Sequence, residues 1–379
     1  MLTTLHAQRL LSWFAAWVME LGPLWVKLVN PPRGADPFPG RRKDIRIHTD
    51  DWDRPYIARG RQGGRDYVRT MYEEHWRYYL GWGDVAFELP NEPDCNGTDA
   101  LTMLCEFTIG AIEEAAALGI RLVVFNLPEG NPHDNGTGDV AVSEWKLAKL
   151  APAAKLAVER GHLIDLHAYW RPEVEGPTGR WHALGRVKWT CETWIKQGVD
   201  GSRLRVIVGE TGIDGGIAGH PAREGWRKLS NESAYRAEIV EAERYARAHL
   251  PWAEALCLFT FGWEPPWETF DHYESFARSL IAPLRELGGV AAEPTAPPQP
   301  AALSEAWLAE ARKHKVRYNP DAALGPAIAA TGQWPMANEW TENGVTYQWG
   351  LDVARLMWHL WRWTPAGGVT RVHSEAVTR

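Results

Sequence analysis

The chain has 379 residues, of which 45% are hydrophobic and 23% are charged, and its formal net charge at pH 7 is −7. A single hydrophobic core usually stops growing at roughly 250 to 300 residues, so we expect one large domain and a smaller one. The acidic excess and the lack of a basic run argue against a nucleic-acid partner held through its phosphates, and no apolar stretch is long enough for membrane insertion.

The first predicted elements are a strand at residues 2–6 and an amphipathic helix. The apolar stretch at residues 10–18 has the length of a signal-peptide core, but Glu20 follows it closely and no small-residue cleavage site is evident. Trp13 and Trp17 repeat at helical spacing. We therefore expect a helix of the fold and no signal peptide.

Short apolar segments bounded by turn residues then alternate with longer helical patterns along the chain. This alternation is typical of repeated βα units and a parallel sheet. Eight strands are predicted, at residues 2–6, 25–29, 45–48, 85–89, 122–126, 163–168, 204–209 and 255–261.

Helical periodicity fills the intervals between these strands. Glycines mark three expected helix ends, where a left-handed cap would fall: Gly119, Gly161 and Gly198. Eight repeats close a barrel, and no glycine-rich phosphate loop follows the first strand, so we predict an α/β protein with a (β/α)8 TIM barrel rather than an open doubly wound sheet. The predicted helices include residues 65–79, 100–118, 143–160, 187–197 and 232–249.

A Pro/Ala-rich run, AAEPTAPPQPAA, marks a domain boundary after the barrel. We predict a barrel at residues 1–288, a linker at 289–303 and a small Trp-rich C-terminal module at 304–379. Within the module, residues 353–363 form either a strand or a short helix. The module either contacts glycans or the cell wall, or packs on the barrel and stabilises it.

The chain contains 22 tryptophans and four cysteines. Any one tryptophan is most simply a core residue, but flat indole faces also stack on the apolar faces of sugars, so the excess favours a carbohydrate ligand. The cysteines lack zinc-site spacing, and we expect buried free thiols, with Cys257 inside a barrel strand.

Two glutamates follow predicted strands, at the rim where TIM barrels place their active sites. Glu92 comes after the fourth strand and Glu210 ends the seventh. Glycosidic cleavage needs two carboxyl groups on either side of the anomeric carbon. We expect Glu92 to stay protonated near neutral pH and Glu210 to stay ionised.

Asn91-Glu92-Pro93 after strand four and Glu210 after strand seven resemble the clan of retaining glycosidases that includes cellulases, mannanases and β-galactosidases. The resemblance covers roughly residues 2–285. It implies that Glu92 is the general acid/base, that Glu210 is the nucleophile and that Asn91 binds the sugar 2-hydroxyl. His167-Ala168-Tyr169 is similar to the clan's H-x-Y, whose side chains contact the nucleophile.

The resemblance extends to Trp263, which follows strand eight where the clan often has a sugar-stacking tryptophan. Arg46 is the candidate for the clan's arginine, although it falls inside the predicted third strand. His6, Lys27 and His48 end the first three strands and either line the sugar pocket or fill the barrel. His48 is included among the substrate-binding candidates.

The prediction is thus a retaining β-glycosidase, endo-acting on a β-linked polysaccharide and needing no cofactor. Either glutamate taken alone could instead cap a helix or pair with an arginine. A barrel that only binds glycans would need the tryptophans but not both glutamates. A metal-dependent hydrolase could use His6, His48, His167 and Asp50, but that alternative leaves Asn91-Glu92-Pro93 unexplained.

Overall fold

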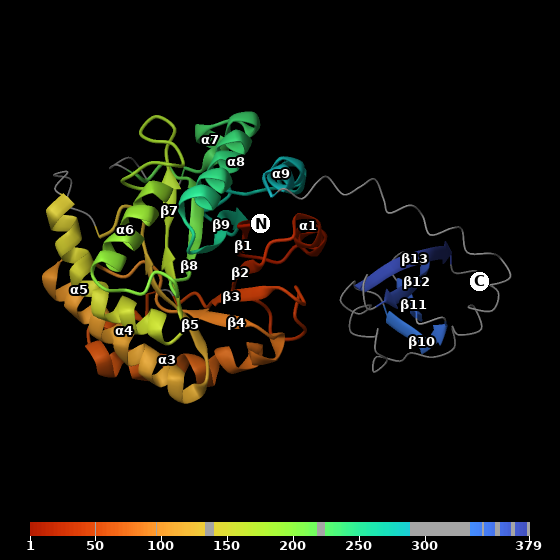
Figure 1. The fold of residues 1–379 in the computed structure, drawn as a ribbon, viewed down its shortest axis with the longest axis horizontal. Helices are drawn as coiled ribbons and strands as arrows, with labels where there is room; N and C mark the ends of the chain where they lie inside the picture. The colour runs from red at the N-terminus through yellow and green to blue at the C-terminus, as the bar shows by residue number, and fades with distance from the viewer. Residues whose placement is uncertain are drawn as a thin grey trace. The chain divides into compact units, whose positions relative to one another are not determined.

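The computed structural model describes residues 1–288, apart from 50, 96, 133–139 and 218–223, together with four strands between residues 334 and 376. The chain divides into two compact units, Met1–Ala291 and Ala292–Arg379. Figure 1 colours the first from red to cyan and the strands of the second in blue. The predicted linker at 289–303 lies outside the described residues.

The first unit is a barrel of parallel strands surrounded by helices (Figure 1). Its strands follow the order β6-β5-β4-β3-β2-β1-β9-β8-β7, and a β6–β8 pairing closes the sheet on itself. Only His167 separates β6 from β7, so these two segments together form one of the eight strands of the barrel in the described part of the unit. The predicted TIM barrel is confirmed. The strands are β1 Thr3–Ala7, β2 Trp25–Val29, β3 Arg42–Arg46, β4 Val85–Glu88, β5 Arg121–Leu127, β6 Leu163–Leu166, β7 Ala168–Trp170, β8 Val206–Ile213 and β9 Ala253–Phe261.

The third strand begins at Arg42 rather than at the predicted Ile45. Its sequence is RKDIR, in which Ile45 is the only apolar residue, so a search for apolar runs does not find the strand. Lys43 is nevertheless buried and its ammonium donates to the carbonyl oxygen of Trp82 at 2.8 Å, while Asp44 is fully buried inside the barrel. Tertiary partners thus override the poor strand preference of this segment.

The helices cover the outside of the barrel, and the predicted glycine caps are confirmed. Gly119, Gly161 and Gly198 have φ values of 67°, 77° and 96°. Asn231 caps α8, because its side-chain oxygen accepts a hydrogen bond from the Ala234 amide at 3.0 Å. The helices are α1 Phe14–Leu21, α2 Arg54–Ile57, α3 Gly60–Glu74, the 3₁₀ helix η1 Trp76–Trp82, α4 Thr98–Leu118, α5 Val140–Glu159, α6 Leu184–Lys196, α7 Trp226–Leu229, α8 Glu232–His249 and α9 Glu274–Leu287.

Helix α3 begins five residues before its predicted start because its glycines serve packing rather than termination. A Cβ added at Gly64 would lie 1.9 Å from the carbonyl oxygen of Phe107 on α4. A Cβ at Gly110 on α4 would lie equally close to the carbonyl oxygen of Arg61. These two glycines therefore let the backbones of α3 and α4 touch.

The barrel interior is built in layers, because inward-facing side chains recur every second residue. An apolar floor contains Trp25, Ala86 and Leu163. Two residues further along the same strands come Lys27, Glu88 and Asp165, all fully enclosed. Together with Asp44 we call these the charged layer: Lys27, Asp44, Glu88 and Asp165. The layer places four ionisable groups directly between the floor and the rim.

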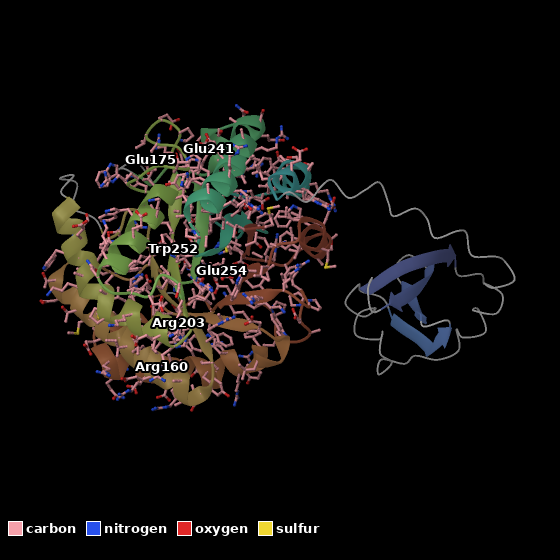
Figure 2. The ribbon with its side chains drawn as sticks, viewed as in Figure 1. Arg160, Glu175, Arg203, Glu241, Trp252 and Glu254 are labelled. Carbon is pink, nitrogen blue, oxygen red and sulfur yellow. The ribbon has the colours of Figure 1, made fainter. Side chains whose placement is uncertain are left out.

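The strand starts carry a separate, solvent-facing ion-pair group. Glu254, labelled in Figure 2, accepts from Arg42 at 3.3 Å and from Arg205 at 3.1 Å. It also accepts from the indole N–H of Trp25 at 3.2 Å. Charges at this end of a TIM barrel contribute to stability rather than catalysis.

The four cysteines are buried and free, as predicted, and Cys257 lies in β9 beside the apolar floor. Among the described helices, none combines the length and apolar character needed to cross a membrane.

The second unit is an antiparallel meander in the order β10-β11-β12-β13. Its strands are β10 Trp334–Glu342, β11 Val345–Asp352, β12 Met357–Thr364 and β13 Gly368–Ala376. The segment predicted as strand or short helix therefore contains a strand, β12, although residues 353–356 lie outside the described part. The role of this sheet stays a prediction.

Candidate active site

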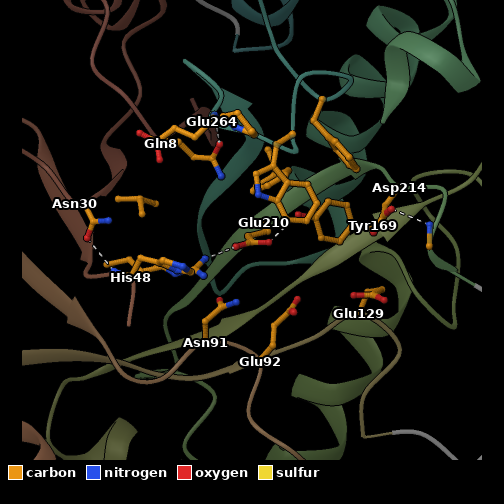
Figure 3. Close-up of a pocket in the computed structure, with 17 residues that line it drawn as sticks. Gln8, Asn30, His48, Asn91, Glu92, Glu129, Tyr169, Glu210, Asp214 and Glu264 are labelled. Carbon is orange, nitrogen blue, oxygen red and sulfur yellow. Dashed lines mark hydrogen bonds and ion pairs between the residues drawn. The ribbon is translucent and has the colours of Figure 1, made fainter. Parts of the chain in front are cut away.

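A cavity of about 380 Å³ opens at the C-terminal ends of the barrel strands (Figure 3). Six of the residues predicted for the site line this cavity, and they come from four different strands of the barrel. Local sequence alone therefore does not show that they are neighbours. These six are Arg46, His48, Asn91, Glu92, Tyr169 and Glu210.

Glu210 lies in β8 with its carboxylate held at both oxygens. Arg46 donates to Oε1 at 2.7 Å and the Tyr169 hydroxyl donates to Oε2 at 2.8 Å. Burial by itself would raise the pKa of Glu210, but the positive charges of His167 and Arg46 outweigh it and hold the pKa far below its usual range. The Glu210 carboxylate is therefore ionised and oriented, as the sequence predicted.

Glu92 follows β4 in a left-handed backbone conformation, with φ of 45°. Its amide donates to the carbonyl oxygen of Asn126 at 3.0 Å, and its own carbonyl oxygen accepts from Arg54 at 2.9 Å. This conformation is costly for a residue with a Cβ, and the two bonds hold it in place. The side chain is 38% exposed, against 7% for Glu210, so Glu92 is the carboxyl that an entering molecule meets first. Its protonated state stays a prediction.

His167 joins the two glutamates from behind the cavity. Its Nδ1 lies 2.9 Å from Oε1 of Glu92 and 3.6 Å from Oε2 of Glu210. Burial lowers the pKa of this imidazole, but the charge of Glu210, the hydrogen bond to Glu92 and the charge of Asp165 together raise it to about 9. His167 thus acts as a buried cation that positions both carboxylates, and it is not among the residues that line the cavity.

Arg46 and His48 reach the cavity from the end of β3. Arg46 was predicted to lie inside the third strand, but the strand ends at this residue, which leaves the guanidinium free to extend to Glu210. His48 is held by its backbone, because its amide donates to Oδ1 of Asn30 at 2.9 Å. Asn91 lines the same wall, and its buried Oδ1 accepts no hydrogen bond from any described residue.

The tryptophan that lines the cavity is Trp267 and not Trp263, which was predicted to do so. Trp267 packs edge-on against Phe259 and Phe270, with ring centroids 5.3 Å and 5.5 Å away. Both tryptophans belong to the loop after β9, and the path of that loop decides which one enters the cavity. The two tryptophans are only four positions apart, and the sequence alone does not tell which of them lines the cavity.

The remaining strand-end candidates fill the barrel instead of lining the cavity. His6 is fully buried with Nδ1 3.2 Å from the carbonyl oxygen of Gly209. Lys27 pairs with Glu88 at 2.5 Å and with Asp165 at 3.5 Å. Of the two interpretations open for these residues, barrel filling holds for His6 and Lys27, and cavity lining holds for His48.

Sequence reasoning missed several polar residues of the cavity. They lie just after β1, β2 and β5, at the end of β8 and just after β9, so a systematic search of the rim could have found them. None forms a recognisable motif. They are Gln8, Asn30, Glu129, Asp214 and Glu264.

Two groups in the described part of the barrel have the donor atoms to hold a metal ion. Glu92, His167 and Glu210 each offer an atom within 4.8 Å of the others, and so do Asp44, Glu88 and Asp165. Neither group is the predicted metal set, because His6 and His48 belong to neither, and Asp50 lies outside the described residues. In the second group, the Lys27 ammonium pairs with Glu88 and Asp165 and already supplies the positive charge that a metal ion would bring.

No family model and no curated protein matches the chain. Among solved structures, an endo-β-1,4-glucanase from Xanthomonas axonopodis pv. citri carrying a triple mutation is 13% identical, with 73% of this chain and 89% of that chain covered and a TM-score of 0.43. A family 5 xyloglucanase from Paenibacillus pabuli is 11% identical, with 73% and 88% covered and a TM-score of 0.41. A chitinase from Rhizomucor miehei is 10% identical, with 76% and 100% covered and a TM-score of 0.39. The barrel itself is defined by the strand order and the β6–β8 pairing described above.

Proposed function

We propose that this chain is a retaining glycoside hydrolase that cleaves β-glycosidic bonds by double displacement. The observation that carries the proposal is the pair of rim carboxylates, Glu92 and Glu210, each with an oxygen within 4.8 Å of the other and of Nδ1 of His167. Retaining enzymes hold their two carboxyl groups about 5 to 5.5 Å apart, whereas inverting enzymes leave room for a water at about 6.5 to 9.5 Å. This proximity favours the first arrangement.

Glu210 is the proposed nucleophile. Its ionised carboxylate attacks the anomeric carbon while the bond from that carbon to the leaving oxygen breaks. Arg46 and the Tyr169 hydroxyl, at 2.7 Å and 2.8 Å, keep the carboxylate charged and aimed. The product of this step is a glycosyl ester on Glu210 and a free alcohol.

Glu92 is the proposed general acid and then base. It gives its proton to the leaving oxygen in the first step and takes a proton from the attacking water in the second, which releases the sugar and regenerates Glu210. His167, at 2.9 Å, keeps the carboxyl in place through both steps. Asn91 is proposed to bind the hydroxyl at the sugar's 2-position, next to the reacting carbon.

A β-linked polysaccharide cut internally is the proposed substrate. Trp267 lines the cavity, and indole faces suit sugar rings. We propose that the β10–β13 sheet contacts glycans, which would keep the barrel near its substrate. Deleting residues 289–379 should then weaken binding to insoluble polysaccharide and leave hydrolysis of short aryl glycosides unchanged. Equal losses on both substrates would refute this role.

The decisive test compares wild type with Glu210→Gly on aryl β-glycosides and β-linked polysaccharides, with and without azide. The variant should be inactive, and azide should restore turnover and give a glycosyl azide of inverted configuration, because azide takes the place of the missing carboxylate. Activity of Glu210→Gly without azide would contradict the assigned nucleophile.

A metal-dependent hydrolase is the competing candidate, because Glu92, His167 and Glu210 could together ligate a divalent ion. Against it, Arg46 and Tyr169 already occupy both oxygens of Glu210. A chelator would abolish activity in the metal-dependent case and leave a double-displacement glycosidase unaffected. A barrel that binds polysaccharide in the calorimeter but cleaves none would support the glycan-binding alternative.

A further inference from the structure

One strand of the barrel delivers three polar side chains to its interior. Asp165 lies in β6, His167 joins β6 to β7, and Tyr169 lies in β7. They are spaced two residues apart, so they project to the same side of the strand. Asp165 belongs to the charged layer, and Tyr169 lines the cavity and donates to Glu210. His167 therefore lies between the charged layer and the rim.

The carboxylate of Asp165 is fully buried and held at both oxygens. Oδ1 accepts from the Gly209 amide at 2.7 Å, and Oδ2 lies 3.5 Å from the Lys27 ammonium. A Cβ added at Gly209 would lie 2.0 Å from Oδ2, so the absence of a side chain there makes room for the carboxylate. Burial raises the pKa of Asp165, while the positive charges of Lys27 and His167 oppose the rise and favour the ionised form.

Asp165 also lies against the imidazole of His167. Its Oδ2 is 3.8 Å from Nε2, while Nδ1 of the same ring is 2.9 Å from Oε1 of Glu92 and 3.6 Å from Oε2 of Glu210. The ring thus has one carboxyl group behind it and two in front. It can direct an N–H towards both sides only when both nitrogens are protonated.

The other charged and titratable groups near His167 do not take the place of Asp165. Burial lowers the pKa of His6 well below its usual range, which favours the neutral form of this second imidazole. Arg186 donates to the backbone carbonyl oxygen of His167 at 3.4 Å and not to the ring. Burial raises the pKa of Glu129 to about 7, so this carboxyl is only partly ionised near neutral pH.

The contributions to the charge of His167 change during the proposed reaction. Burial lowers the pKa of His167, but the charge of Glu210, the hydrogen bond to Glu92 and the charge of Asp165 outweigh it and raise the pKa to about 9. In the first step Glu210 becomes a neutral ester, and Glu92 gives up its proton. Asp165 is enclosed and takes part in neither step, so its contribution stays the same.

We infer that Asp165 is a positioning residue of the proposed reaction, and that it keeps both nitrogens of His167 protonated through the two steps. The single imidazolium then balances Glu210 before the glycosyl ester forms and Glu92 after it forms. The proton that reaches the leaving oxygen comes from Glu92, and the attacking water returns one to Glu92, so His167 neither gains nor loses a proton. The inference rests on the proposed glycosidase function of the same cavity.

The first test observes the imidazole and needs no turnover. The full chain is labelled with ¹⁵N in its histidines, and the His167 signals are assigned by their loss in His167→Gln. Both ring nitrogens should be protonated at pH 7 in the wild type. Asp165→Asn should lower the pKa of His167 by about 1 to 3 pH units, because an opposite charge in close contact is lost. A neutral ring in the wild type at pH 7, or an unchanged pKa in the variant, overturns the inference.

Glu88→Gln is the matched control. Glu88 is as fully enclosed as Asp165 and pairs with the same lysine, Lys27, at 2.5 Å. Within the described part of the chain it forms no ion pair with His167. Both variants should lower the free energy of unfolding, but only Asp165→Asn should move the titration of His167 by this amount. An equal shift in both variants would assign the effect to the layer as a whole and overturn the role of Asp165.

A second measurement uses the wild type alone and decides the matter if Asp165→Asn does not fold. A 2-fluoro glycoside that leaves a slowly hydrolysed ester on Glu210 removes the charge of that carboxylate. The ring of His167 should still carry both protons at pH 7 in this ester, because Asp165 remains behind it. Loss of a ring proton on esterification overturns the inference.

The pH dependence of turnover distinguishes positioning from a merely structural role. In Asp165→Asn, kcat should fall about tenfold for each pH unit by which the pKa of His167 falls, with KM nearly unchanged, because Asp165 does not line the cavity. Loss of the imidazolium raises the pKa of Glu210 and of Glu92, so both limbs of the profile of kcat/KM against pH should move to higher pH. A lower kcat with both limbs in place would show a structural role only and overturn the inference.

The outcomes separate this inference from the proposed function. If the wild type cleaves glycosides and Asp165→Asn changes neither the titration of His167 nor the pH profile, the inference is overturned and the glycosidase stands. If the wild type cleaves no glycoside, the glycosidase fails and the role of Asp165 in the reaction fails with it. A lowered pKa of His167 in Asp165→Asn would still show, in that case, that Asp165 holds the imidazolium.

Discussion

The barrel contains two clusters of carboxylates, one sealed and one open, and they are balanced in different ways. In the charged layer, Lys27 lies between Glu88 and Asp165, and every member is fully buried. In the cavity, Arg46 and His167 offset the charge of Glu210, and the carboxyl groups of Glu129 and Asp214 line the same cavity. A sealed cluster must be neutralised from within, whereas an open one can leave charge for a ligand to neutralise.

The pKa values show the same contrast. Burial by itself would lower the pKa of Lys27, but the charges of Glu88, Asp165 and Asp44 outweigh it and raise the pKa. Burial and the charge of Glu88 raise the pKa of Asp44 well above its usual range, which favours the protonated form of this carboxyl. Within the layer, the Lys27 ammonium and a proton on Asp44 would thus offset two of the three carboxyl groups. Apart from Asp165, the layer should therefore govern stability, and the cavity should govern turnover.

The contrast between the charged layer and the cavity can be tested by substitution, and the largest expected effect is on turnover. Glu210→Gln should lower kcat by about three orders of magnitude or more, because it removes the proposed nucleophile. The free energy of unfolding in urea should fall far less, since the amide can still accept from Arg46 and Tyr169. Near-wild-type turnover, or a collapse of stability with it, would break the comparison.

The next effect is on stability. Lys27→Met should lower the free energy of unfolding by about 3 to 5 kcal/mol, because it leaves buried carboxylates without their counter-charge. The double variant Lys27→Met/Glu88→Gln removes both partners and should recover part of the loss, which a double-mutant cycle in urea measures. A single variant as stable as the wild type would show that the layer is not held by this ion pair.

His167 links the two clusters, and its effect depends on pH. Its Nε2 lies 3.8 Å from Oδ2 of Asp165, and its Nδ1 faces Glu92 and Glu210. The pKa rises from 6.5 to about 9 on folding, so the stability that His167 contributes is complete below pH 6.5 and is lost as the pH climbs towards 9. The difference in unfolding free energy between wild type and His167→Gln should shrink over that window, and a constant difference would exclude a charged imidazole.

The smallest expected effect concerns the aromatic face of the cavity. Trp267→Ala should raise KM by a few-fold to about tenfold and change kcat little, because the variant loses the apolar surface of the indole from the cavity and no group that touches the reacting atoms. Trp263→Ala is the matched control from the same loop and should leave KM unchanged. The reverse result would restore the assignment made from sequence.

The charged third strand shows where prediction from sequence fails. Strands β2, β4 and β5 were found because both of their faces are buried, which makes them apolar runs. Strand β3 reads RKDIR and looks like a surface segment. Its partners lie elsewhere in the chain: Trp82 for Lys43 and Glu210 for Arg46. Charge becomes compatible with burial only when these partners are in place.

The sequence by itself determined the barrel, its helix ends and the two rim glutamates, because these follow from local signals: apolar periodicity, glycine caps and positions at strand ends. Only the tertiary structure decided that His167 bridges Glu92 and Glu210, that Trp267 rather than Trp263 enters the cavity, and that Glu129 and Asp214 join them. The physical reason is that the sheet closes into a barrel. Residues 40 to 120 positions apart become neighbours only when the sheet closes on itself, and loop paths depend on packing against that closed surface.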